Sequence, residues 1–219
     1  MELRAATLAD IPAIHAIYAH HVLHGLASFE IEPPSVTEMQ RRFEAVTAGG
    51  YPYLAATDDG GTVVGYAYAS AYRTRPGYRY TVEDSVYVAP PAVGRGIGGQ
   101  LLSLLIDQCE RRGYRQMLAV IGDSANAASI ELHRACGFAH SGTLRSVGLK
   151  FGRWIDSVIM QRGLGESDHS VPRVQGGSTA RSCGLPVRYS APTEASARRT
   201  SSTPSADSGA CGGSGVPTA

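Results

Sequence analysis

The chain lacks the features that define several large classes of protein. In its 219 residues no apolar run approaches the roughly 20 residues that a membrane-spanning helix needs. The first residues, Met1 to Thr7, lack the basic, then apolar, then small segments of a signal peptide. We therefore expect no membrane partner and a cytoplasmic location.

An excess of charge of either sign is also missing. Lys and Arg number 20 and Asp and Glu number 19, which gives a formal net charge of +1. Such a balance provides no strong field to attract nucleic acid, so we expect no nucleic-acid partner. Lysine itself is almost absent. Lys150 is the only one, and we interpret this as a coding bias of the source genome.

Cysteine is scarce and unpatterned. The four cysteines form no Cys-x-x-Cys pair and no His/Cys cluster at zinc spacing, and they are Cys109, Cys136, Cys183 and Cys211. We expect no metal site, and a reducing cytoplasm suits these thiols.

Large apolar residues become rare after Gly165. Residues 165–219 contain 11 Ser, 8 Gly and 5 Pro, but only four Val, one Leu and one Tyr. Such a segment cannot bury enough apolar surface to offset chain entropy, so we predict a disordered tail. A short docking motif at residues 185–189 is the alternative. Residues 1–164 then form one domain, with 15 basic and 15 acidic residues.

Strand and helix patterns alternate through this domain. Thr7, Asp10 and Pro12 mark the start of a helix that ends at Gly25, and Ser35 with Glu38 marks a second that ends at Gly49. Further helices are predicted at 98–112 and 127–136. Strands are predicted at 53–57, 62–71, 80–88, 117–121, 138–144 and 155–161.

A glycine-rich loop, residues 93–99, follows the strand that ends near Val88 and opens a helix. Glycines let backbone N–H groups approach a ligand, and the helix N-terminus adds partial positive charge. The loop therefore indicates a pyrophosphate site, with a ligand-free glycine turn as the alternative. It fits neither the P-loop pattern nor the dinucleotide pattern GxGxxG.

The loop resembles the acetyl-CoA pyrophosphate loop of the GNAT superfamily of N-acetyltransferases, Gln/Arg-x-x-Gly-x-Gly/Ala. Gly96 and Gly98 match, whereas Val93 replaces Gln or Arg, which removes one side-chain contact and keeps the backbone cradle. Residues 126–138 resemble a second family pattern, Asn-x-x-Ala-x-x-Leu-Tyr-x-x-x-Gly-Phe. The matches are Asn126, Leu132, Gly137 and Phe138, and the departures are Ser129 for Ala and His133 for Tyr.

Other segments resemble one branch of the superfamily, which acts on phosphinothricin, methionine sulfoximine and methionine sulfone. They lie at 28–29, 65–69, 80–88, 119–122 and 148–156, and the resemblance spans residues 2–164. It implies the α/β (α+β) GNAT fold, a mixed and mostly antiparallel sheet flanked by helices. It also implies acetyl-CoA as cosubstrate and a homodimer, with residues 150–156 as a candidate interface.

Glu83 is the candidate general base for acetyl transfer. Along the strand, Glu83, Ser85 and Tyr87 share one face, and a carboxylate there is costly to bury without a partner. A cationic substrate would supply that partner; an ion pair with Arg73, Arg75 or Arg79 is the alternative. The resemblance also places a catalytic glutamate here. It puts His133 where many relatives have a tyrosine that protonates the leaving thiolate, the alternative being a merely packed histidine.

The remaining site residues fall into two groups. We expect acetyl-CoA to contact the end of the strand, the glycine loop and the start of the next helix, at Val86, Tyr87, Val88, Gly94, Arg95, Gly96, Ile97, Gly98, Gly99 and Asn126. Asn126 could instead only cap its helix. Arginine suits the oxyanions of an amino-acid acceptor. We predict substrate contacts at Phe29, Arg73, Arg75, Gly77, Tyr78, Arg79, Glu83, Asp84 and Ser85, with Phe29 as an aromatic wall and Asp84 mainly structural.

Three hypotheses follow. The first is an acetyl-CoA-dependent N-acetyltransferase for phosphinothricin, methionine sulfoximine or methionine sulfone, working by direct transfer. The second keeps the fold and changes the acceptor to a protein N-terminus, an aminoglycoside or a polyamine. The third is an acyl-CoA-binding module without turnover. The histidines of the first helix are interpreted as surface or satisfied residues.

Overall fold

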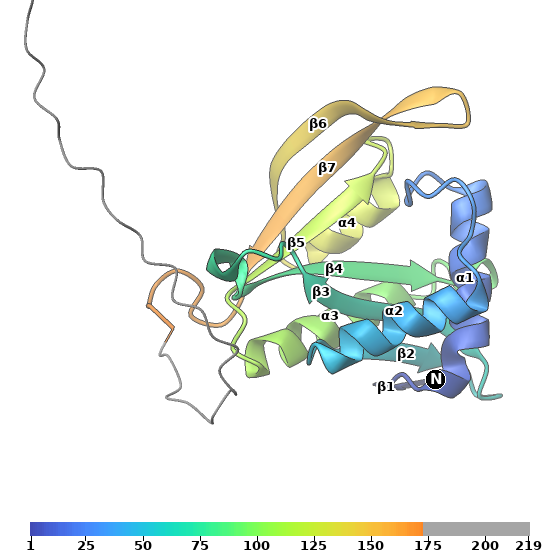
Figure 1. Ribbon diagram of the computed structural model, residues 1–219, viewed down its shortest axis with the longest axis horizontal. Coiled ribbons are helices and arrows are strands. Elements are labelled where there is room, and N and C mark those ends of the chain that lie inside the picture. Colours follow the sequence, from blue (N-terminus) through green and yellow to red (C-terminus); the bar gives the residue numbers. More distant parts are fainter. Residues whose placement is uncertain (173–219) are drawn as a thin grey trace, which may run out of the picture. The chain divides into compact units, whose positions relative to one another are not determined.

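Seven strands form one mixed sheet, in the order β1-β2-β3-β4-β5-β7-β6 (Figure 1). The computed structural model describes residues 1–172, which lie within one compact unit, Met1–Val174. The strands are β1 (Glu2–Ala5), β2 (Tyr53–Thr57), β3 (Val63–Ala71), β4 (Thr81–Val88), β5 (Gln116–Gly122), β6 (Ala139–Lys150) and β7 (Arg153–Gly163). All neighbouring pairs are antiparallel except β4 and β5, so the predicted mixed, mostly antiparallel sheet is confirmed.

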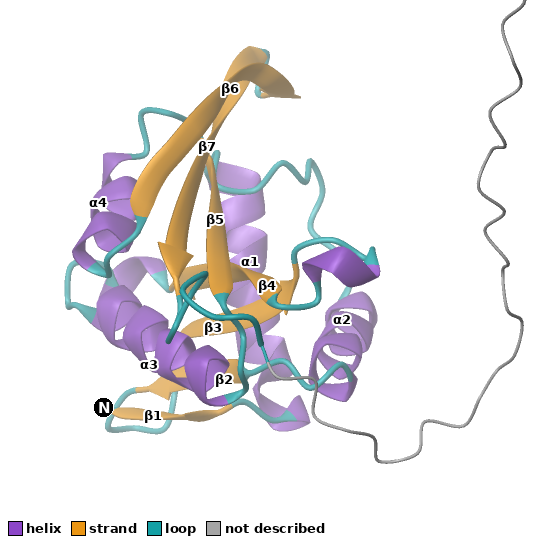
Figure 2. Cartoon of the chain, turned by 90° about the vertical axis from the view of Figure 1, so that its left-hand side faces the viewer, coloured by secondary structure: helices purple, strands orange, loops and turns teal. Residues whose placement is uncertain are grey.

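Helices cover both faces of the sheet (Figure 2). They are α1 (Ile11–His24), α2 (Val36–Ala48), α3 (Ile97–Arg111) and α4 (Ala127–Ala135). Alternation along the strands divides the core in two. Leu54, Ala67 and Val82 pack with α3, whereas Tyr53 and Tyr66 pack with α1 and α2.

The helix signals in the sequence act as predicted. The Asp10 carboxylate accepts a hydrogen bond from the Thr7 N–H at 2.7 Å, and the Ser35 hydroxyl accepts one from the Glu38 N–H at 3.1 Å. Gly25 and Gly49 end α1 and α2. These caps fix where the loop between α1 and α2 begins and ends.

The sheet differs from the prediction at both edges. Strand β1 was not predicted, because four residues are too few to show the alternation of apolar and polar side chains; its pairing with β2 defines it as a strand. Strands β6 and β7 are longer than predicted, because irregularities near His140 and between Leu144 and Gly148 break the alternation of β6. The hairpin closes at Phe151 and Gly152, both with positive φ, and extends beyond the rest of the sheet (Figure 1).

Residues 165–170 form turns beside the sheet. The Gln116 amide donates to the Ser167 hydroxyl at 2.7 Å, and Arg115 pairs with Glu166 at 3.3 Å. The disorder predicted for the tail stays a prediction from residue 173 on. Those residues, with Cys183, Cys211 and the 185–189 motif, lie outside the described residues. Within residues 1–172, no helix has the length and apolar character needed to cross a membrane.

Candidate active site

Strands β4 and β5 separate in the middle of the sheet. Their parallel pairing runs from Thr81–Gln116 to Asp84–Ala119 and then stops, although β4 continues to Val88 and β5 to Gly122. Two cavities open where they diverge. The central cavity, about 270 Å³, is lined by Ala27, Phe29, Tyr68, Glu83, Asp84, Ser85, Val86, Tyr87, Ala119, Val120, Ile121, Gly122, Asn126, Ser129 and His133.

Glu83 faces the central cavity from the α1/α2 side of the sheet. It lies opposite Ser70 on β3, and its side chain is half-buried. Burial raises the pKa of its carboxyl, and the neighbouring charge of Asp84 raises it further. Among residues 1–172 Glu83 forms no ion pair, so the alternative partners Arg73, Arg75 and Arg79 are not bound to it. A half-buried carboxylate without a cation is suited to accepting a proton.

Asp84 and His133 form a buried pair on the opposite face. The His133 Nε2 lies 3.0 Å from Asp84 Oδ2, and its Nδ1 lies 2.7 Å from the Ser129 carbonyl oxygen. Burial lowers the pKa of His133, but the hydrogen bond and charge of Asp84 outweigh it and the net direction is upward. Two oxygen acceptors are best satisfied by a ring that carries both protons. The second Asp84 oxygen, Oδ1, has no protein partner.

The second cavity, about 650 Å³, extends from the central cavity along the glycine loop. It is lined by the end of β4, the glycine loop, the start of α3 and part of α4, and also by the end of α1, the start of the α1–α2 loop and the end of β5. Gly94 and Gly96 have φ values of 81° and 76°, which a side chain would strain, and Gly96 directly precedes α3. A Cβ on Gly98 would meet Leu132 at 3.3 Å. The backbone of the glycine loop is thus open to a ligand just before α3, whereas the first turn of α3 packs closely against Leu132 of α4.

Most of the predicted cosubstrate residues meet in this second cavity. Val86, Tyr87, Val88, Gly94, Gly96, Ile97, Gly98, Gly99 and Asn126 line it, whereas Arg95 is exposed and does not. Asn126 caps α4, since its Oδ1 accepts from the Ser129 N–H at 3.2 Å, and it borders both cavities. His21 was not predicted, because no local pattern marks it; it lines the second cavity and donates from Nε2 to the Val88 carbonyl at 2.9 Å.

The α1–α2 loop, residues 25–35, lies against two strand glycines. A Cβ on Gly122 of β5 would lie 2.3 Å from the Leu26 carbonyl oxygen, and one on Gly148 of β6 would lie 2.0 Å from the Phe29 ring. Phe29, predicted as an aromatic wall, lines the central cavity. Glycine inside a strand often marks the close approach of another backbone, and that signal could have located the loop.

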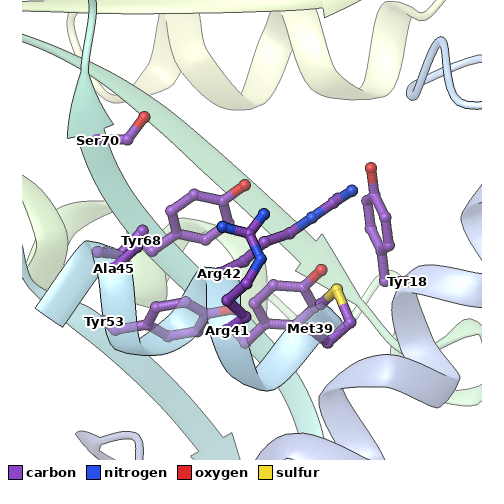
Figure 3. A pocket seen from close by; sticks show the side chains of 10 residues that line it. Tyr18, Met39, Arg41, Arg42, Ala45, Tyr53, Tyr68 and Ser70 are labelled. Atoms are coloured by element: carbon purple, nitrogen blue, oxygen red, sulfur yellow. The ribbon is translucent and has the colours of Figure 1, made fainter. Parts of the chain in front are cut away.

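The β3–β4 loop lies apart from the described cavities. Arg73, Arg75, Gly77, Tyr78 and Arg79 are exposed and line none of them. Arg73 and Arg79 instead lie over the rings of Tyr72 and Tyr80, at 5.0 and 4.7 Å. The arginines that do border a cavity are Arg41 and Arg42 of α2. They line a third cavity of about 300 Å³ together with tyrosines of the sheet. Figure 3 shows Arg41 and Arg42 beside Tyr53 and Tyr68.

The described residues form no group of three or more His, Cys, Asp or Glu side chains that could hold a metal ion. The site combines a half-buried carboxylate, a buried His–Asp pair and a glycine loop. These elements meet where the two strands diverge.

Comparison with known proteins places this arrangement in a family. A family model described as "Acetyltransferase (GNAT) domain" matches residues 3–159. The phosphinothricin N-acetyltransferase of Alcaligenes faecalis is 56% identical over 163 residues, 74% of this chain and 82% of that protein. An L-methionine sulfoximine/L-methionine sulfone acetyltransferase of Salmonella typhimurium is 44% identical, over 78% of this chain and 98% of its own length.

A solved structure agrees with these relatives. The phosphinothricin acetyltransferase of Sinorhizobium meliloti, solved in complex with AcCoA, superimposes with a TM-score of 0.78 at 49% identity, covering 81% of this chain and 95% of its own. The chain belongs to the GNAT family of acetyltransferases and is an acetyl-CoA-dependent N-acetyltransferase.

Proposed function

We propose that this enzyme transfers the acetyl group of acetyl-CoA to the amino group of a small amino acid of the phosphinothricin, methionine sulfoximine or methionine sulfone type. The names of its relatives support this acceptor class. The observation that carries the proposal is the end of β4–β5 pairing at Asp84–Ala119, which brings Glu83 and the glycine loop to two connected cavities. An acetyl donor and an amine can meet there from opposite sides of the sheet.

Glu83 is the proposed general base. Its carboxylate takes a proton from the acceptor ammonium, directly or through one water, and the free amine attacks the thioester carbonyl carbon. A C–N bond forms, the C–S bond breaks, the thiolate leaves, and the nitrogen gives its second proton to water as it becomes the amide. Transfer is direct, because Cys109 is buried in the α3 core and Cys136 lies at the end of α4, so neither described cysteine lines the central cavity.

The strand edge beyond Asp84 is the proposed support for the donor. Residues Ser85 to Val88 pair with β3 but have no β5 partner, so the N–H groups that point away from β3 are available to polarise the thioester oxygen and to bind the pantetheine arm. The N-terminus of α3, with Gly94 and Gly96, suits the pyrophosphate.

His133 is the proposed proton donor to the leaving thiolate. Its hydrogen bond with Asp84 favours the protonated form needed for this role. Because both ring N–H groups have protein acceptors, Asp84 and the Ser129 carbonyl, proton donation requires one of them to leave its acceptor. Asp84 therefore supports the ring instead of contacting the acceptor.

An acceptor panel tests the proposal. Purified enzyme is incubated with acetyl-CoA and phosphinothricin, methionine sulfoximine, methionine sulfone, an aminoglycoside, a polyamine or an N-terminal peptide, and free thiol is followed. We expect turnover with the first three. Turnover confined to another amine would replace the acceptor class. Thermal stabilisation by acetyl-CoA without turnover of any amine would favour a binding module.

We propose a homodimer, formed through the β6–β7 hairpin. Five large apolar side chains there are 53–66% exposed, namely Leu144, Val147, Leu149, Phe151 and Trp154. Exposed apolar patches often mark interfaces. Light scattering should give twice the mass of one chain, and Trp154→Glu should lower it to one; a monomer at every wild-type concentration would contradict the dimer. The cytoplasmic location expected from the sequence stays a prediction.

A further inference from the structure

The only lysine of the chain is buried at the end of β6. Lys150 is 2% exposed, and its Nζ donates to the Ser28 carbonyl oxygen at 2.7 Å, across 122 positions of sequence. Burial lowers the pKa of the amine. Burying an ammonium group is costly in free energy, which indicates a function for the hydrogen bond that Lys150 makes.

The Lys150–Ser28 hydrogen bond lies next to the residue of the α1–α2 loop that borders the central cavity. Ser28 directly precedes Phe29, whose ring forms part of the central cavity and lies against Gly148 of the same hairpin. The Lys150 bond and the Phe29 contact are thus two residues apart on β6 and one apart on the loop. Together the two contacts hold the loop segment Ser28–Phe29 against β6.

Other contacts fasten the loop to the helices. The Tyr18 and Ser28 hydroxyl oxygens lie 3.0 Å apart, and Arg42 of α2 pairs with Glu30 at 2.6 Å. These contacts join the loop to the α1/α2 layer, whereas Lys150 joins it by a polar bond to the hairpin. The loop segment that carries Phe29 to the central cavity is therefore held from two sides, by the helices and by Lys150.

We propose that Lys150 is a positioning residue that sets the acceptor side of the site, by holding Phe29 over the central cavity. The kinetic part of this inference rests on the proposed function, since it requires an amine acceptor bound beside Phe29. The donor side is formed mainly by the end of β4, the glycine loop and α3; the α1–α2 loop borders it only through Gly25, Leu26 and Ala27, and no residue of the hairpin lines it. Loss of Lys150 then affects the acceptor and spares acetyl-CoA.

Hydrogen exchange tests the tether without any turnover. Lys150→Met keeps the length and apolar stem but removes the donor, while Lys150→Arg keeps a cation with N–H donors. Arg153→Met is the matched control, because it removes a cation from the exposed position opposite Lys150 on β7. We expect amides of residues 26–31 to exchange about tenfold faster in Lys150→Met, a loss typical of one hydrogen bond from a charged group. Exchange should be near wild type in Arg153→Met and intermediate in Lys150→Arg.

Steady-state kinetics then separates positioning from general damage. In Lys150→Met we expect the acceptor KM to rise about tenfold, with the KM for acetyl-CoA unchanged and partial recovery in Lys150→Arg. Unchanged loop exchange, or equal increases of both KM values, would overturn the proposal. If Lys150→Met exchanges faster in the loop but the wild type acetylates none of the amino acids, the structural role of Lys150 is supported and the proposed acceptor class is wrong.

A second variant covers the case in which Lys150→Met does not fold. Gly148→Ala leaves the lysine in place and displaces the Phe29 ring, so it should raise the acceptor KM alone. An unchanged acceptor KM in that variant would show that the position of Phe29 does not affect acceptor binding, and the proposed role of Lys150 would then be wrong.

Discussion

Glu83 and Asp84 are neighbours in sequence and face opposite sides of one strand. Glu83 opens to the central cavity without a cation, whereas Asp84 is bound to a buried histidine. The alternation of β4 predicted this division, because successive side chains of a strand point to opposite faces. The partner of Asp84 was beyond the sequence, since 49 positions separate it from His133.

The Glu83→Gln variant tests the base. We expect kcat to fall by about 10²–10⁴, the usual contribution of a general base. The pKa of Glu83 is raised above its ordinary value, so wild-type activity should fall as the pH drops through that raised value, and the variant should lose this acid limb. Glu131→Gln, at an exposed position of α4, should keep both rate and profile. A full rate in Glu83→Gln at neutral pH would remove the assignment.

The His133–Asp84 pair predicts a pH dependence of stability. The folded pKa of His133 lies above its ordinary value, so its contribution is complete below the unfolded pKa, about 6.5, and is lost as the pH rises through the folded pKa. Urea unfolding of the wild type should thus weaken from pH 6 to pH 9 more than that of His133→Gln. Equal losses in the two proteins would mean that the ring is not held protonated.

At the scale of elements, two glycines of β6 differ in how closely they are packed. Gly148 leaves room for the Phe29 ring, while a Cβ on Gly142 of the same strand would meet nothing within 4 Å. Gly148→Ala should cost about 1–3 kcal/mol in the free energy of unfolding, as overpacking does, whereas Gly142→Ala should be nearly neutral. Chemical denaturation of both variants checks this contrast. Equal stability of the two would show that the loop gives way easily.

Elements with local signals were predictable. The capped helices and the hairpin from Tyr53 to Ala71 follow from residues close in sequence. Strand β1 and the full length of the β6–β7 hairpin were not, because pairing with distant strands decides them. Likewise the glycine loop was found from its own residues, but His21, Arg42 and Lys150 reach the site region from elements whose local patterns carry no functional signal.

For the whole molecule, the ordered domain extends past residue 164, where the composition predicted it to end. Ser167 and Glu166 contact Gln116 and Arg115 beside β5, although they belong to the segment predicted as tail. A chain ending at residue 172 should keep the wild-type kcat/KM and melting temperature. A chain ending at residue 164 should melt lower, because it loses these contacts. A loss of activity on removing residues 173–219 alone would give that segment a role.

The divergence of β4 and β5 has a consequence for proton flow. Under the proposed mechanism Glu83 gains a proton on one face of β4, and His133 loses one on the other. Both side chains border the central cavity, so each turnover would leave Glu83 protonated and His133 deprotonated on opposite faces of one strand. Neither group could act again until Glu83 had released its proton and His133 had regained one, so proton exchange with the water of the central cavity would be a step of every catalytic cycle.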